Sequence, residues 1–166
     1  MVKYIKDEVM VTFSEVPDEI SLTLNISNCP HHCKGCHSPY LRKNIGDELT
    51  EDILEDLIKK NDGITCVCFL GEGNDFEALF NLAKLVRKHN LKTALYTGLD
   101  FFNEYLYYDI QENFDYVKMG EYKEECGPLN KATTNQKMYK IVMDENKDMN
   151  WFNDYKWIDI TNKFWK

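Results

Sequence analysis

Three cysteines, Cys29, Cys33 and Cys36, lie within eight residues of one another in the sequence CPHHCKGC. Thiolates bind soft metals: four of them close a tetrahedral zinc site, and four also fully ligate a cubane of four irons and four sulfides. Three cysteines at this spacing can hold three corners of such a cubane and leave one iron open to a substrate or cofactor. The alternative is a structural zinc site completed by one of the neighbouring histidines.

The other three cysteines have simpler interpretations. Cys66 and Cys68 lie two residues apart in an apolar run, so they face the same side of a strand and are expected to be small buried hydrophobes. Cys126 lies next to Gly127 in a predicted loop and is expected to be a free thiol. Clustered cysteines without a secretion signal favour a metal or catalytic role over a disulfide framework.

Strands are predicted directly before the segments that carry chemistry. Residues 20–26 alternate apolar and polar side chains and end where the cysteine segment begins. The apolar run 64–70 ends at Gly71-Glu72-Gly73, and the short strand 93–97 ends at Thr97-Gly98. Because ligands bind at the carboxyl ends of parallel strands, these three features are expected to share one rim of the sheet.

The rest of the pattern alternates helix and strand. The predicted helices cover residues 50–60, 74–90 and 101–108, and the predicted strands include residues 20–26, 64–70, 93–97 and 114–119. This alternation indicates right-handed βαβ units and an α/β fold with a parallel sheet. Residues 157–160 are predicted as a late edge strand, whereas residues 140–155 give no clear pattern.

The composition is that of a globular protein. The chain has 166 residues, 43% hydrophobic and 29% charged, with a net charge of -8. An acidic surface repels phosphate backbones, so no nucleic-acid partner is expected. No apolar run approaches the ~18 residues of a membrane helix, and no signal-peptide core is present, so we expect a cytoplasmic protein without membrane contact. A single domain over residues 1–166 is expected, with a core of about 10–141 and a C-terminal extension over 142–166.

The cysteine loop resembles that of radical S-adenosylmethionine enzymes, which carry three cysteines at this spacing after the first barrel strand. A closer resemblance is to the activating proteins of anaerobic ribonucleoside-triphosphate reductase. It rests on the segment from Asn28 to His31, on Gly35-Cys36-His37 with Pro39, on Tyr96-Thr97-Gly98 and on Thr134-Asn135-Gln136-Lys137. The resemblance covers about residues 10–141. A closed eight-unit barrel needs roughly 200 residues or more, so we expect a partial, laterally open (β/α) barrel of about five to six units.

The resemblance implies a role for individual residues. Cys29, Cys33 and Cys36 would hold a [4Fe-4S] cluster whose open iron chelates S-adenosylmethionine. The residues implied in binding that cofactor are His37, Gly71, Glu72, Gly73, Asn74, Tyr96 and Thr97. No side chain is expected to act as acid or base, because the cofactor carries the reaction. The implied partners are the large subunit of the reductase, which receives a glycyl radical, and an electron donor such as flavodoxin.

The sequence departs from the family pattern at several positions. Gly35 stands where many radical enzymes have an aromatic residue, and Ser38 stands where this subfamily has asparagine. The Gly-rich turn is shifted by one residue, so either Glu72 or Asp75 could meet the methionine ammonium. Two other functions stay open: a radical enzyme that acts on another glycyl radical enzyme or on a small molecule, and a zinc-binding interaction module.

Overall fold

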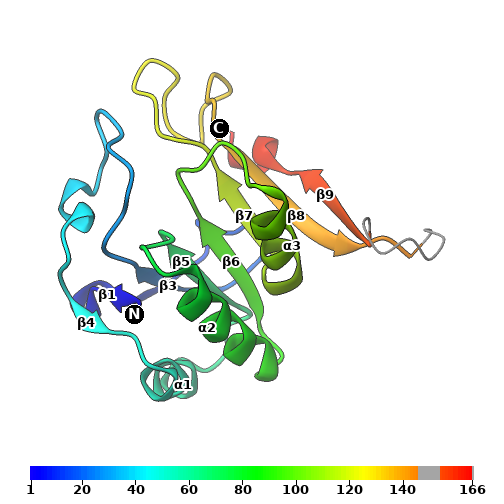
Figure 1. Cartoon of the computed structure of the whole chain (residues 1–166). Helices are drawn as coiled ribbons and strands as arrows, with labels where there is room; N and C mark the ends of the chain where they lie inside the picture. Colours follow the sequence, from blue (N-terminus) through cyan, green and yellow to red (C-terminus); the bar gives the residue numbers. More distant parts are fainter. Residues whose placement is uncertain (146–153, 166) are drawn as a thin grey trace.

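A seven-stranded sheet forms the centre of the protein, as a computed structural model describes it for residues 1–145 and 154–165 (Figure 1). In spatial order its strands are β2 (Met10–Thr12), β3 (Ser21–Asn25), β5 (Cys66–Leu70), β6 (Lys92–Tyr96), β7 (Tyr116–Met119), β8 (Lys137–Met143) and β9 (Tyr155–Asp159). The four strands β3, β5, β6 and β7 are parallel, whereas β2, β8 and β9 pair antiparallel with their neighbours. A separate small sheet pairs β1 (Lys3–Tyr4) with β4 (Asp47–Glu48).

A polar side chain caps the start of each α-helix. The side chains of Thr50, Asp75 and Asn103 each accept a hydrogen bond from the backbone N–H three residues later. These caps begin α1 (Glu51–Lys60), α2 (Phe76–Lys88) and α3 (Glu104–Asn113). Helix α3 begins after the predicted residue 101, because the capping asparagine holds the chain extended before it. Short 3-10 turns lie at η1 (Lys6–Glu8), η2 (Pro39–Arg42) and η3 (Thr161–Phe164).

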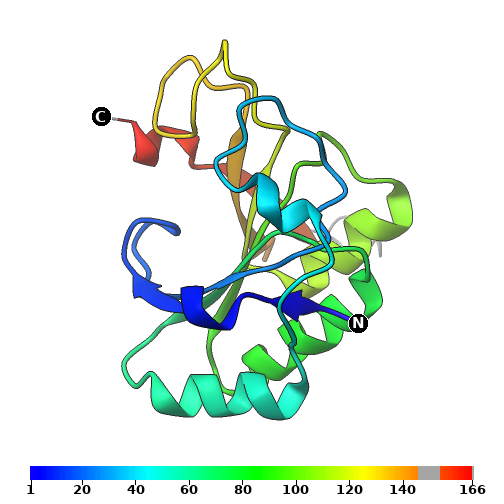
Figure 2. The same ribbon diagram turned by 90° about the vertical axis from the view of Figure 1, so that its left-hand side faces the viewer.

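The sheet separates two cores. Helices α1, α2 and α3 lie on one side, and the blue N-terminal loop and red η3 lie on the other (Figure 2). The larger core packs strand residues such as Val67 and Leu95 against the helices. The smaller core covers the opposite face with Val16, Cys66, Cys68, Ala94, Tyr116, Met138 and Ile160. Cys66 and Cys68 are fully buried there and free of disulfides, so both behave as small hydrophobes.

A buried carboxylate ties the amino ends of the parallel strands together. Glu19 accepts hydrogen bonds from the Lys92 ammonium (2.7 Å), the Tyr116 hydroxyl (2.7 Å) and the Thr65 hydroxyl (2.6 Å). Burial alone would raise the pKa of Glu19, but these hydrogen bonds outweigh it and hold the pKa below its ordinary value. The network lies at the end of the sheet opposite to the rim where the strands finish.

The predicted α/β class with a parallel sheet is confirmed. The described residues contain four parallel strands joined by three helices, fewer than the five to six units expected, and the two outer strands β2 and β9 leave the sheet open. A partial barrel stays a prediction. The late edge strand is present as β9, whereas β8 was not predicted. Among the described residues, no helix has both the length and the apolar character needed to cross a bilayer.

Candidate iron-sulfur site

The cysteine segment is a closed loop that begins where β3 ends. The N–H of Cys29 donates to the carbonyl of Leu41 (2.9 Å), and the guanidinium of Arg42 donates to the carbonyl of Cys33 (2.7 Å). Asn28, just before the first cysteine, has a φ of 60°, a left-handed conformation that asparagine adopts more readily than most residues. The loop is therefore fixed both at its base and near its middle.

The three thiols of this loop are free and partly exposed. Burial raises the pKa of the Cys29 thiol, and a hydrogen bond from the His31 backbone lowers it by less. The Glu72 carboxylate and the other two thiols raise this pKa further. In the described part of the chain, no three His, Cys, Asp or Glu side chains are arranged around a single metal ion. The ligands of a cubane bind different irons and do not converge on one point.

Glu72 lies at the same rim, in the turn that follows β5, and only 2% of it is exposed. Its carboxylate is hydrogen-bonded to the imidazole Nε2 of His31, which belongs to the cysteine loop. This bond raises the pKa of His31 above its ordinary value. The same imidazole covers Gly98 after β6, where an added Cβ would lie 2.5 Å from His31 Cδ2. The contacts bring the ends of β3, β5 and β6 together, as the sequence predicts.

Lys118, in β7, contributes a buried ammonium that sequence analysis did not single out. It is 9% exposed and pairs in register with Tyr96 on the neighbouring strand. The ammonium donates to the carbonyls of Gly120 (2.9 Å) and Thr97 (3.5 Å). Burial lowers the pKa of Lys118 to about 8, although nearby thiols and carboxylates, above all Cys33, act in the opposite direction. A lysine in an otherwise apolar strand gives no sequence signal for this position.

The Gly-rich turn packs directly under the start of the cysteine loop. At Gly71, where φ is 121°, an added Cβ would lie 3.0 Å from the carbonyl oxygen of Ile26. Asn74 is exposed, and the carboxylate of Asp75 is occupied by the α2 cap and by the amino terminus of the chain. Of the two carboxylates that the sequence offers, Glu72 is therefore the one held at the rim.

The remaining predicted cofactor contacts differ in how they face the rim. The Tyr96 hydroxyl donates to the carbonyl of Glu15, so this ring packs with the smaller core and only its backbone is at the strand end. The Thr97 hydroxyl accepts from the N–H of Leu99 (3.0 Å), which shapes the turn after β6. The exposed His37 lies beside the ring of Tyr122, with 5.9 Å between centroids. Gly73, like Gly71, contacts the end of β3.

Two amides hold the chain where it leaves β7. The side chain of Gln136 donates to the carbonyl of Gly120 (3.1 Å), and that of Asn135 donates to the carbonyl of Glu121 (2.8 Å). The loop after β7 packs against the cysteine loop: a Cβ on Gly35 would lie 3.3 Å from the Tyr122 ring. The Thr134–Lys137 motif thus positions the turn to which Lys118 is bonded.

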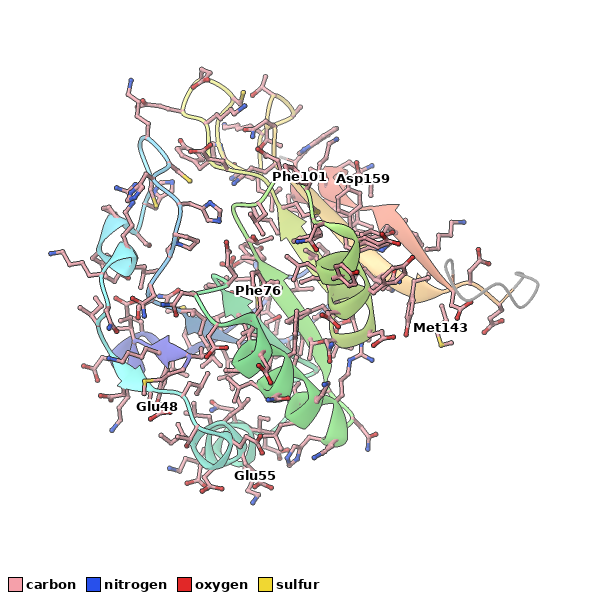
Figure 3. The ribbon with its side chains drawn as sticks, in the orientation of Figure 1. Glu48, Glu55, Phe76, Phe101, Met143 and Asp159 are labelled. Atoms are coloured by element: carbon pink, nitrogen blue, oxygen red, sulfur yellow. The ribbon has the colours of Figure 1, made fainter. Side chains whose placement is uncertain are left out.

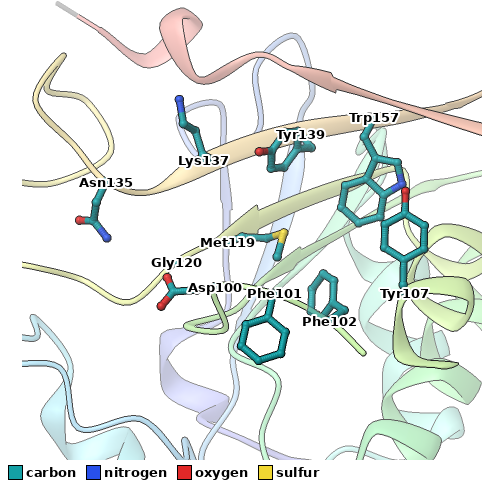
Figure 4. Close-up of a pocket in the computed structure, with 10 residues that line it drawn as sticks. All are labelled: Asp100, Phe101, Phe102, Tyr107, Met119, Gly120, Asn135, Lys137, Tyr139 and Trp157. Carbon is teal, nitrogen blue, oxygen red and sulfur yellow. The ribbon is translucent and has the colours of Figure 1, made fainter. Parts of the chain in front are cut away.

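An aromatic pocket of about 410 Å³ adjoins the rim (Figure 4). Tyr107 of α3 stacks on Trp157 of β9 with ring centroids 5.0 Å apart, and these rings line one end of the pocket. Phe101 lines it near the strand ends and is 78% exposed (Figure 3). Asp100 and Gly120 belong to the pocket wall as well, so the pocket and the turn after β7 share residues.

Comparison with protein families agrees with the chemistry of the loop. A family model described as a 4Fe-4S single cluster domain matches residues 20–142. The chain belongs to this family. The matched segment runs from the start of β3 into β8 and includes the cysteine loop, the Glu72 turn and Lys118. The comparisons with curated proteins and with solved structures returned no match. The predicted division into core and C-terminal extension stays a prediction.

The residues at the rim fit the cofactor of a single cluster domain. Family membership supports a [4Fe-4S] cluster, and the loop supplies three free, partly exposed thiols, the donor type that such clusters require. A buried cation faces the same loop, which suits an anionic group. Which cysteines ligate the irons is a proposal.

Proposed function

We propose that this protein is a cytoplasmic radical S-adenosylmethionine activase that generates a glycyl radical on anaerobic ribonucleoside-triphosphate reductase. The proposal is carried by one observation: the buried Glu72 carboxylate stands beside a loop with three free cysteines, at the carboxyl end of a parallel sheet. When bound, a cluster held by three thiolates offers one open iron to the amino acid part of the cofactor and supplies the electron that cleaves its sulfonium.

The residues of the chain orient the cluster and S-adenosylmethionine relative to each other. Cys29, Cys33 and Cys36 hold the cluster. Glu72 accepts the methionine ammonium, and for this its carboxylate exchanges the His31 imidazole for the cofactor. Buried from solvent, such a charged hydrogen bond is stronger than it is in water.

The rest of the rim binds the other parts of the cofactor. The backbone of Gly71, Gly73 and Asn74 borders the methionine, and the backbone of Tyr96 with Thr97 borders the ribose. His37, at the Tyr122 ring, covers the adenine. No side chain has to transfer a proton.

The exposure of the rim supports a protein as substrate. The three thiols are partly exposed, and Phe101 in the aromatic pocket is largely exposed, so a large molecule can reach this end of the sheet. We propose that the large subunit of the reductase presents its glycine here and that flavodoxin or a similar donor supplies the electron. The net charge of -8 disfavours nucleic acid as the partner.

Electron paramagnetic resonance tests this function. The protein is reconstituted with iron and sulfide without oxygen, reduced with dithionite, and measured with and without S-adenosylmethionine. A cubane signal that changes shape when the cofactor is added is expected, because the open iron gains ligands. Addition of the reductase should then give a glycyl radical doublet.

Two cysteine variants serve as a matched pair. Cys33→Ala should abolish both the cubane signal and cofactor cleavage, whereas the buried Cys66→Ala should retain both. Full cleavage of S-adenosylmethionine by Cys33→Ala would refute the assignment of the cluster to these three cysteines. Bound zinc and no cluster signal in the wild type would mean that the loop is structural. A normal cluster and cofactor cleavage, without a doublet on the reductase, would point to another glycyl radical enzyme or to a small molecule as the substrate.

A further inference from the structure

Lys118 is a buried cation, and within the part of the chain that the structure describes its ammonium forms no direct ion pair with a carboxylate. Its ammonium donates to the carbonyls of Gly120 and Thr97, and the residue is 9% exposed. The other paired lysines of the sheet differ: Lys92 bonds to Glu19, and Lys137 bonds to Asp159. A charge removed from water is costly unless an opposite charge compensates it, so this site is built for an anion.

The position of Lys118 identifies that anion. The residue lies one step from the end of β7, in register with Tyr96, and so on the face of the sheet that carries the smaller core. Cys33, Glu72, Asp100 and Cys29 are close enough to act on it electrostatically. Glu72 is already bonded to His31, and Asp100 is exposed, so solvent screens its charge. The thiols of the loop become thiolates when they bind irons.

We propose that Lys118 is the internal counter-charge of the iron-sulfur cluster and raises its reduction potential. A cubane with three thiolate ligands carries net negative charge, and reduction adds one electron without making or breaking a bond. A fixed cation with little solvent around it stabilises the reduced, more negative state more than the oxidised state. The inference rests on the assignment of the cluster to Cys29, Cys33 and Cys36, and it does not require that the protein activate a reductase.

A redox titration of the reconstituted protein, without S-adenosylmethionine, tests this role. Dithionite with low-potential mediators supplies the electrons, and the signal of the reduced cubane reports its fraction. Lys118→Met keeps an unbranched side chain that is one atom shorter and removes the charge. At the same applied potential, its ratio of reduced to oxidised cluster should fall about tenfold, which corresponds to about 59 mV for a one-electron couple. Lys118→Arg should restore most of the wild-type ratio.

A second lysine provides the control. Lys137 lies next to Met119 in the register of β7 and β8 and is 49% exposed at its side chain. Lys137→Met removes the same charge from a solvated position, so screening should leave the ratio within about twofold. Iron and sulfide content, measured for every variant, separates a change of potential from a loss of cluster. Lys118→Gln, which can still donate to Gly120, replaces the methionine variant if that one does not fold.

The outcomes separate this inference from the proposed function. An equal ratio in wild type and Lys118→Met, at equal cluster content, overturns the counter-charge and leaves the cysteine assignment intact. If Lys118→Met leaves the ratio of reduced to oxidised cluster unchanged but weakens the binding of S-adenosylmethionine, the lysine binds the cofactor carboxylate. That result would also overturn the counter-charge proposal. A wild type that takes up no cluster overturns both proposals.

Discussion

Replacing Glu19 by glutamine should destabilise the protein by about 2 kcal/mol at pH 7. The carboxylate accepts three side-chain hydrogen bonds at 2.6 to 2.7 Å and its side chain is only 6% exposed. A hydrogen bond to a charged group is worth roughly 1.5–3 kcal/mol and a neutral one about 1 kcal/mol. The contribution of Lys92 is discounted because its side chain is 46% exposed and screened. In the variant, the two hydroxyls donate to a neutral acceptor instead of a charged one, and the ion pair with Lys92 is weakened. These two losses together give this figure.

The effect should depend on pH in a definite direction. Since the pKa of Glu19 is lower in the folded protein than in the unfolded chain, its stabilisation is complete above the unfolded value of about 4.3. It is lost as the pH falls through the folded pKa, where wild type and variant carry the same charge at this position. The difference between them should therefore be constant from about pH 7 to pH 5 and shrink in more acidic solution.

Urea unfolding followed by circular dichroism measures both effects. With a slope of about 2 kcal/mol per molar, the midpoint of Glu19→Gln should fall by about 1 M at pH 7. Asp18→Asn is the control, because it removes the neighbouring carboxylate from a side chain that is 76% exposed, and it should change the midpoint little. Equal midpoints for the two variants at pH 7, or a Glu19→Gln difference that persists undiminished at pH 3, would refute the reasoning.

Three further variants test other contacts. Gly98→Ala should lower the melting temperature, because the new methyl group takes the place of the His31 ring beside Glu72. A second change of His31→Ala relieves the clash but removes the hydrogen bond to Glu72, so it should recover only part of the loss. Tyr96→Phe should cost about 1 kcal/mol in urea unfolding, because it leaves a backbone carbonyl of the N-terminal loop without its donor. Cys66→Ala should cost about 1 kcal/mol through lost packing, with unchanged iron content after reconstitution. A large iron loss there would contradict its role as a core residue.

Hydrophobic periodicity predicted the parallel strands and the helices between them, because each of these elements has one clear pattern. It also predicted that the cysteine loop and Glu72 share one rim, since this follows from strand direction alone. The start of α3 was misplaced because aromatic residues before Asn103 resemble the apolar face of a helix. Strand β8 was missed because its alternation is weak and its pairing depends on β7 and β9, which lie elsewhere in the sequence.

The orientation of single side chains was harder to predict. Tyr96 belongs to the motif that ends β6, yet its ring shares a face with Ala94 and packs into the smaller core. Which face is which depends on the register of the whole sheet. The burial of Lys118 is likewise a tertiary property: the strand reads as apolar with one charge, and nothing local shows that the charge points inward.

The smaller core has a consequence for the order in which the protein is made. Its covering residues come from both ends of the chain: Val16 from the N-terminal loop, and Ile160 with Phe164 from the last turn. The parallel strands and the cysteine loop are complete once residue 120 has left the ribosome. The residues of the last 3-10 turn that cover this face of the sheet are synthesised after the strands, and such distant contacts form slowly. During translation, the inner face of the sheet therefore stays uncovered on the side of η3 after the strands that carry the site have been made.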